Sequence, residues 1–225
     1  MRKIFLILVL IIVSVSCKKA DAEAECYGCL YFGKPQPEND SELIGFPSRF
    51  KGLYVDKDST FLRIEEDRIL KEYFFKNRFH KSFLDSLKDY YNIVNGQLIE
   101  KETLKKYSMI EIGDSLEISR KDIDTIFRFS YNQKAKIINS HIVISNRDSI
   151  FWRISIISLQ KNILKMKYIY FADDVKKIDS VTKIKGQKID SLSYLLKPTR
   201  SEFRKILKIK NLGREEEYNK ISKID

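Results

Sequence analysis

Ile110-Glu111-Ile112, Gly113-Asp114 and Ser115-Leu116-Glu117-Ile118 form the stretch that decides the fold class of this chain. Apolar and polar residues alternate on both sides of Gly113-Asp114, which is the pattern of two antiparallel strands with one covered face. A glycine at the first central position of a two-residue turn adopts the positive φ that a tight hairpin needs. Residues 110–118 therefore predict a β-hairpin.

The same pattern recurs along the chain. Asn95-Gly96 separates Ile93-Val94 from Gln97-Leu98-Ile99, which predicts a second hairpin with a type I′ turn. β-branched and aromatic residues dominate the other expected strands, as a pleated, half-buried surface requires. These strands are predicted at 52–55, 60–65, 69–75, 125–130, 141–145, 150–159, 163–171 and 193–196. The fold class is predicted to be mainly β with minor α, built from antiparallel meander sheets.

Two segments resemble copies of one unit. Residues 53–64 compare with residues 142–154, and the resemblance continues downstream at 69–71 with 163–165 and at 84–87 with 178–181. Small loop insertions account for the drifting offset. This interpretation predicts a first β unit at 45–131 and a second at 132–225. Chance resemblance among strand-rich segments is the alternative.

The clearest helix follows Pro198. Thr199 and Glu202 form a Thr-x-x-Glu capping box, and Gly213 is expected to follow the helix as its C-terminal cap. We expect the apolar face to dock onto the sheet, with a membrane-surface helix as the alternative. The apolar face consists of Phe203, Ile206 and Leu207, and a basic contact face is predicted at Arg200, Arg204, Lys205 and Lys208.

The charge of the chain is unevenly distributed. The sequence holds 42 basic and 31 acidic residues, a net charge of +11. Residues 176–225 hold 14 basic and 7 acidic residues, so this last quarter alone carries +7. Such a basic region suits an anionic envelope component or an acidic protein, and a solvated face is the plainer interpretation.

The N-terminus has the order of a secretory signal. Arg2 and Lys3 precede an apolar run from residue 4 to residue 15, followed by Ser16 and Cys17. The run is shorter than the about 20 apolar residues that cross a bilayer. Residues 1–16 are therefore predicted to be a signal peptide, and the protein is predicted to leave the cytoplasm.

The end of this run, Ser14-Val15-Ser16-Cys17, resembles the lipobox of bacterial lipoproteins. The resemblance implies lipidation of Cys17 and a membrane anchor, in a periplasmic or surface-facing lipoprotein of the outer membrane. Plain secretion, with Cys17 as an ordinary thiol, is the alternative. The Cys17-Lys18-Lys19 start and residues 124–127 and 194–199 are similar to small β-rich lipoproteins of the Bacteroidota. That resemblance implies an envelope address and a sheet-plus-helix build, with no activity attached.

Residues 17–44 are predicted to be a lipidated, flexible tether, because their charged and proline-containing sequence buries too little apolar surface to offset its ordering entropy. Cys26 and Cys29 lie in this tether as Cys-Tyr-Gly-Cys. In an oxidising compartment they are expected to form a disulfide or to remain structural thiols. Redox or zinc chemistry is less favoured, because the pair lacks a strand-and-helix context and the chain has only two histidines.

No catalytic signature is found. The sequence lacks a Gly-x-Ser-x-Gly elbow, a phosphate-cradling glycine loop and a His-Glu-x-x-His motif, so no catalytic residue, metal or cofactor is predicted. A nucleic-acid partner is not expected outside the cytoplasm. The leading hypothesis is a non-enzymatic module that binds a protein or an envelope component. An immunity lipoprotein that neutralises a toxin and a glycan hydrolase with paired carboxylates are the alternatives.

Overall fold

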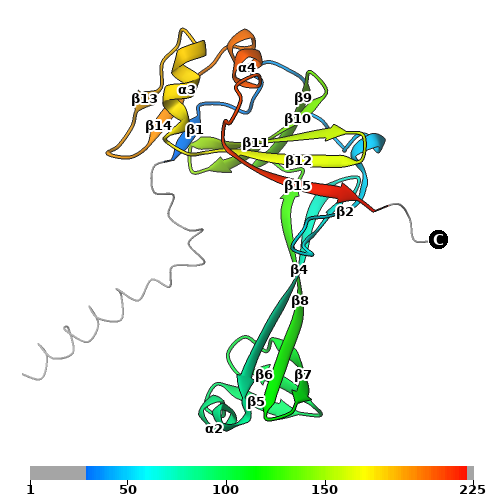
Figure 1. Cartoon of the computed structure of the whole chain (residues 1–225). Coiled ribbons are helices and arrows are strands. Elements are labelled where there is room, and N and C mark those ends of the chain that lie inside the picture. The colour runs from blue at the N-terminus through cyan, green and yellow to red at the C-terminus, as the bar shows by residue number, and fades with distance from the viewer. Residues whose placement is uncertain (1–28, 222–225) are drawn as a thin grey trace, which may run out of the picture.

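The computed structural model describes residues 29–221. Strands account for 51% and helices for 13%, which confirms the predicted mainly β fold class. Figure 1 shows a rounded body and, below it, an arm that hangs from two long strands. We define the arm as residues 74–123, which include the distal parts of these two strands and everything between them. The other described residues form the body.

Fifteen strands build both parts. The two long strands that connect body and arm are β4 (Arg68–His80) and β8 (Ser115–Arg128). The arm adds β5 (Tyr91–Val94), β6 (Gln97–Glu100) and β7 (Lys106–Ile112). The body contains β1 (Leu30–Phe32), β2 (Gly52–Val55), β3 (Phe61–Ile64), β9 (Gln133–Ile138), β10 (His141–Asp148), β11 (Phe151–Gln160), β12 (Ile163–Ile169), β13 (Gln187–Lys188), β14 (Tyr194–Leu196) and β15 (Arg214–Lys220).

The helices are short. The arm holds the 3₁₀ turn η2 (Lys81–Phe83) and α2 (Leu84–Leu87), and the body holds the 3₁₀ turn η1 (Ser48–Phe50), α3 (Asp174–Val181) and α4 (Arg200–Ile206). Among the described residues, no helix is long and apolar enough to cross a membrane.

All the strands belong to one sheet, in the order β13-β14-β1-β11-β12-β15-β2-β3-β4-β8-β7-β6-β5, with β10 paired to β11 and β9 to β10. Consecutive strands pair antiparallel within the runs β2-β3-β4, β5-β6-β7-β8, β9-β10-β11-β12 and β13-β14, as the meander prediction expects. The exception to the antiparallel pattern is β1, which pairs parallel with β14 and makes the sheet mixed.

Both predicted hairpins are confirmed. Ile112 pairs with Ser115 across the turn that joins β7 to β8, where Gly113 has a φ of 60°. Val94 pairs with Gln97 across the turn between β5 and β6. Asn95 and Gly96 both have positive φ there, at 49° and 72°, as a type I′ turn requires.

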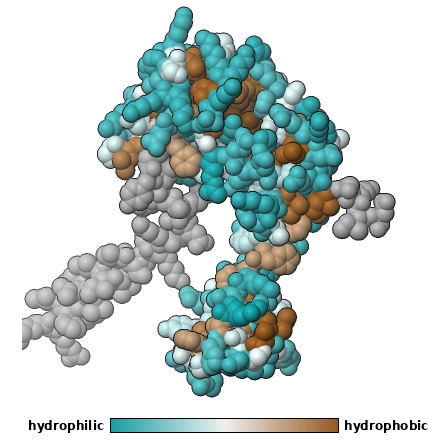
Figure 2. Space-filling view, in the orientation of Figure 1, coloured by the Kyte–Doolittle hydropathy of each residue, from teal (hydrophilic) through white to brown (hydrophobic). Residues whose placement is uncertain are grey.

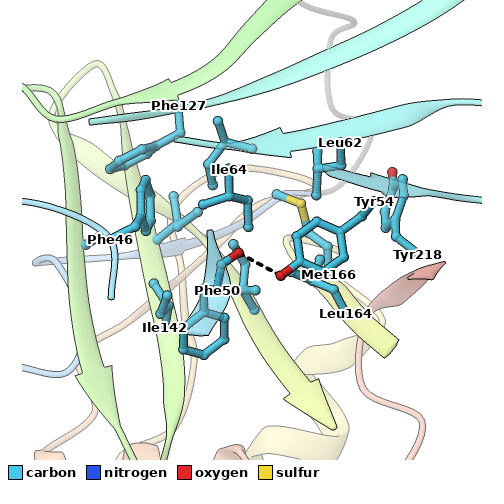
Figure 3. Close-up of a cluster of buried hydrophobic side chains, with 14 residues drawn as sticks. Phe46, Phe50, Tyr54, Leu62, Ile64, Phe127, Ile142, Leu164, Met166 and Tyr218 are labelled. Atoms are coloured by element: carbon cyan, nitrogen blue, oxygen red, sulfur yellow. Dashed lines mark hydrogen bonds between the residues drawn. The ribbon is translucent and has the colours of Figure 1, made fainter. Parts of the chain in front are cut away.

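The larger of two cores fills the inside of the curled sheet in the body. Its side chains come from strands at both ends of the curl, such as Phe127 of β8 and Ala135 of β9. Figure 3 shows Phe46 and Phe50, from the segment before β2, inserted among the strand side chains. The hydroxyl of Tyr54 donates a hydrogen bond to the carbonyl oxygen of Phe50 at 2.7 Å. This bond fixes the η1 turn to β2.

The second core lies on the opposite face of β10–β12, where α3 and α4 pack. Val143 and Ile156 of the sheet belong to the same buried cluster as Ile178 of α3 and Phe203 of α4. The predicted docking of the C-terminal helix onto the sheet is therefore confirmed. Because both faces of these strands are covered, adjacent apolar residues are buried on opposite faces, at Ile142-Val143-Ile144 of β10 and at Ile156-Ile157 of β11.

The capping box of α4 is also confirmed. The Thr199 side chain accepts from the N–H of Glu202, and the Glu202 side chain accepts from the N–H of Thr199. The predicted cap at Gly213 is wrong, because α4 ends at Ile206. Gly213 precedes β15 with a φ of +68°, and a Cβ atom there would lie 2.1 Å from the carbonyl oxygen of Tyr168. Glycine is needed for this close approach to β12.

The prediction of a flexible tether over 17–44 is wrong for residues 29–44. Leu30 and Phe32 of β1 are fully buried between β14 and β11. Further on, the buried Lys136 ammonium donates to the carbonyl oxygens of Pro35 and Pro37, at 3.5 and 2.9 Å. The prediction failed because the segment is polar on average, although two of its few apolar residues, Leu30 and Phe32, belong to the second core. Residues 17–28 lie outside the described residues.

The two segments compared as repeats each fold as a hairpin followed by a third antiparallel strand, β2-β3-β4 and β10-β11-β12. Ser59 and Ser149, which correspond in the comparison, both have positive φ, at 61° and 56°. The larger core takes side chains from both sides of residue 131. The two units thus share one core, and the duplication itself stays a prediction.

Candidate functional site

The arm exposes apolar side chains more than the body does. Of the 17 large apolar residues that are exposed in the described chain, ten lie within residues 74–123. Only Leu98, Leu116 and Ile118 of the arm are buried. Figure 2 shows brown and tan residues on the arm and at its junction with the body. The exposed ten are Phe74, Phe75, Phe83, Tyr90, Ile93, Val94, Leu104, Ile110, Ile112 and Ile123.

An aromatic groove lies on one face of the arm sheet. It has a volume of about 270 Å³ and takes side chains from β4, η2, α2, β5, β6, β7 and β8. The sheet order in the arm places these strands side by side, and the alternation along β4 directs every second side chain into the groove. The lining residues are Phe75, Asn77, Phe79, Phe83, Leu87, Tyr91, Leu98, Tyr107 and Ile118.

Tyr107 lies at the centre of the aromatic contacts in this groove. Its ring meets Phe75 edge-on at 5.7 Å and Tyr91 edge-on at 6.2 Å between centroids. The Arg120 guanidinium stacks 4.7 Å from the ring centroid and donates to the Tyr107 hydroxyl at 3.1 Å. Arg120 is held in turn by Asp122 at 2.7 Å. These contacts fix the groove wall before any ligand arrives.

A second, smaller groove adjoins the first. It has a volume of about 250 Å³ and lies between α2 and β5, the last strand of the sheet. Leu87, Tyr91 and Leu98 line both grooves. The other lining residues of this edge groove are Leu84, Lys88, Asn92 and Ile93.

A larger cleft, about 640 Å³, lies in the body and is charged. Three of its carboxylates, those of Asp56, Glu215 and Glu216, already have partners. Asp56 accepts from the N–H groups of Asp58 and Thr60 at 2.8 Å each, which makes it a turn residue. Glu215 pairs with Lys165 at 3.0 Å across β12 and β15, and Glu216 accepts from the Tyr218 hydroxyl at 2.8 Å.

The carboxyl groups with perturbed pKa values are not tuned for acid catalysis. A glycosidase acid needs a raised pKa. Burial opposes ionisation of Glu215, but its hydrogen bonds to Lys165 and Lys167 outweigh it and lower the pKa. The pKa of Glu72 is likewise lowered, chiefly by its hydrogen bond to Lys121. Within residues 29–221, no group of three or more His, Cys, Asp or Glu side chains is placed to hold a metal ion.

The predicted site residues fall in three places. Cys17 and Cys26 precede the described residues, so lipidation and the pairing of Cys26 with Cys29 stay predictions. Cys29 is buried and disulfide-bonded, and its backbone bridges to Phe171 beside β1. Of the predicted basic face, Arg200 pairs with Asp40 at 2.5 Å and so ties α4 to the segment after β1. Arg204, Lys205 and Lys208 are exposed on α4 and its C-terminal end.

The arm was not predicted as a site. Its sequence contains one signal that points to it: Phe74 and Phe75 are adjacent in one predicted strand, which places their rings on opposite sides of that strand. In a sheet with a single covered face, one of these two rings must remain exposed.

Comparison with known proteins finds no matching family model, no matching curated protein and no matching solved structure.

Proposed function

We propose that this protein is a lipid-anchored, non-enzymatic protein of the bacterial cell envelope that binds another protein through its arm. The observation that carries the proposal is the gathering of ten exposed large apolar residues on a projecting part that buries only three. Soluble surfaces rarely group apolar side chains in this way unless a partner covers them. The arm has little core of its own, so its apolar residues are available to a partner.

The N-terminal sequence supplies the anchoring part of the proposal. A lipid on Cys17 would be twelve residues from Cys29, where the described body begins. Twelve extended residues span at most about 40 Å. The body and its arm would therefore stay close to the membrane, where the partner is expected.

Mass spectrometry of the native protein tests the anchor. The expected result is a mature chain that begins at an acylated Cys17, and Cys17→Ser is expected to move the protein from the membrane to the soluble fraction. An intact Met1 or an unmodified Cys17 would contradict the anchoring proposal.

Photo-crosslinking in intact cells tests the binding role of the arm. A benzoylphenylalanine replaces Phe83 on the arm, which is 59% exposed, or Leu192 on the body, which is 50% exposed and serves as the matched control. We expect discrete protein adducts from position 83 only, and fewer of them when Phe75→Ser removes part of the groove. Identical adducts from both positions, or adducts to lipid or glycan alone, would refute protein binding by the arm.

A further inference from the structure

The free edge of β5 carries an inference that deepens the proposed function and rests on it. β5 ends the sheet path, so one side of the strand pairs with β6 and the other side faces no strand. An unpaired edge presents backbone N–H and C=O groups to any extended chain that approaches it.

The pairing register identifies the unpaired groups. Val94 and Gln97 flank the two-residue turn and form a hydrogen-bonded pair, so the pairs alternate from there along the hairpin. The N–H and C=O groups of Ile93 and Tyr91 consequently point away from β6. Glu100 lies opposite Tyr91 and agrees with this alternation. Its N–H donates to the carbonyl oxygen of Lys105 and so points away from β5. Within the described chain, no hydrogen bond reaches the outward groups of Tyr91 and Ile93.

This edge lacks two of the usual protections against pairing, charged residues and proline. Residues 91–99 contain no charged residue and no proline, whereas natural edge strands are normally blunted by charges, prolines or a covering segment. Three other free edges are protected. Leu43 donates to the Ala135 carbonyl at the edge of β9, the two-residue β13 contains Lys188, and the unpaired edge of β4 in the arm carries Lys76 and Arg78.

The two grooves beside this edge indicate the kind of occupant. Their volumes, about 250 and 270 Å³, fall below the roughly 300–1,000 Å³ that is usual for sites that enclose a small molecule. Each groove suits one large side chain. Because the grooves share Leu87, Tyr91 and Leu98, they are adjacent, as alternate side chains of one extended strand would require.

We propose that β5 accepts an extended, uncharged segment of the partner protein as an additional strand. The backbone of that segment pairs with Tyr91 and Ile93, and two of its alternate apolar side chains enter the grooves. The neutrality of residues 91–99 matches an uncharged segment, and Lys88, which also lines the edge groove, is already paired with Asp85. A charged segment would therefore lose hydration without gaining an unpaired opposite charge. A second copy of this chain is a weaker candidate: two four-residue edges form too short a ribbon to supply the about 800 Å² per partner of a stable dimer.

The test measures binding of a fluorescein-labelled hexapeptide to the purified, full mature protein. In this peptide, Leu and Phe alternate with Thr and Ser. A matched peptide carries N-methyl groups on the backbone nitrogens that would face β5. The protein variants are Ile93→Pro, which removes an outward N–H without breaking a β5–β6 bond, and Ile93→Val, which keeps it. Circular dichroism checks that each variant folds.

We expect saturable binding of the first peptide, at least a tenfold loss with the N-methylated peptide or with Ile93→Pro, and little change with Ile93→Val. Equal binding of both peptides would overturn strand addition while leaving the arm as a protein-binding surface. Failure of the wild-type protein to bind the peptide would also overturn strand addition. A dimer in analytical ultracentrifugation that Ile93→Pro abolishes would show that a second copy of the chain, not a partner protein, occupies the edge. If Ile93→Pro does not fold, the N-methylated peptide still decides the question.

Discussion

The side chain of Tyr54 reaches the carbonyl oxygen of Phe50 at 2.7 Å inside the larger core, across four residues of sequence. Tyr54→Phe leaves that buried carbonyl without a donor, which costs about 1–2 kcal/mol of the free energy of unfolding. Urea denaturation measures the loss. Tyr73→Phe is the control, because the Tyr73 hydroxyl bonds to Asp124 at the surface and water can replace it.

Burial also raises the pKa of Tyr54 to about 12. Spectrophotometric titration of the tyrosines in the folded protein is therefore expected to leave at least one hydroxyl un-ionised at pH 11. Tyr54→Phe should reduce that late-titrating fraction. An unchanged titration curve would show that Tyr54 ionises like an exposed tyrosine.

Glu202 stabilises the body through its carboxylate. It is buried and accepts from the N–H groups of Lys183, Ile184 and Thr199 at 2.8, 3.1 and 3.0 Å. Burial opposes its ionisation, but these donors prevail and lower the pKa to about 2. Glu202→Ala leaves these three N–H groups without an acceptor, and we expect a loss of about 3 kcal/mol in the free energy of unfolding.

The acid stability of the protein follows from the same group. Between about pH 4.5 and pH 2 the unfolded chain binds a proton at Glu202 that the folded protein does not. The contribution of Glu202 to the free energy of unfolding is therefore complete above about pH 4.5 and is lost as the pH falls towards about 2. Glu202→Gln should flatten that part of the stability curve. A wild-type curve with the same slope as Glu202→Gln would refute the assignment.

Glu72 supports the arm where it leaves the body. Its side chain is 5% exposed and pairs with Arg63 at 2.8 Å and Lys121 at 2.6 Å. Glu72→Gln weakens both charge-assisted bonds and is expected to cost about 1–2 kcal/mol. Hydrogen exchange should accelerate at the adjoining parts of β4 and β8. Asp85→Asn, which breaks an exposed pair with Lys88, is the control and should leave that exchange unchanged.

The apolar surface of the arm is directly measurable. A double variant, Phe75→Ser with Phe83→Ser, is expected to reduce binding of a hydrophobic dye severalfold, because it removes two rings from the aromatic groove. Ile44→Ser is the control, since Ile44 is 97% exposed as a single residue on the body. If the control reduced dye binding as much as the double variant, the apolar surface would not be concentrated on the arm.

The parts of the fold that depend on local chemistry were predictable. The Asn95-Gly96 turn and the capping box of Thr199 and Glu202 depend only on contacts between residues a few positions apart, so the local sequence is enough to predict them. β15 was not predicted, because Glu215 and Glu217 do not suggest a strand. Their strand conformation depends on Lys165 of β12, which lies opposite and some 50 residues earlier.

The candidate site escaped prediction for a related reason. Alternating apolar residues in β4 and β8 have the pattern of a covered sheet face, and apart from the adjacent rings of Phe74 and Phe75 the local sequence does not reveal that the covering layer is missing over residues 74–123. The buried strand β1 was missed for the opposite reason, because Leu30 and Phe32 stand alone in a polar segment. Exposure and burial here are properties of the assembled sheet.

β15 follows every other strand of the described chain in sequence, yet it lies in the middle of the sheet between β12 and β2. The hydrogen-bonded path between the two halves of the sheet is therefore complete only after β15 has left the ribosome. A stop codon before Arg214 would remove the strand through which the ladders of the two halves connect.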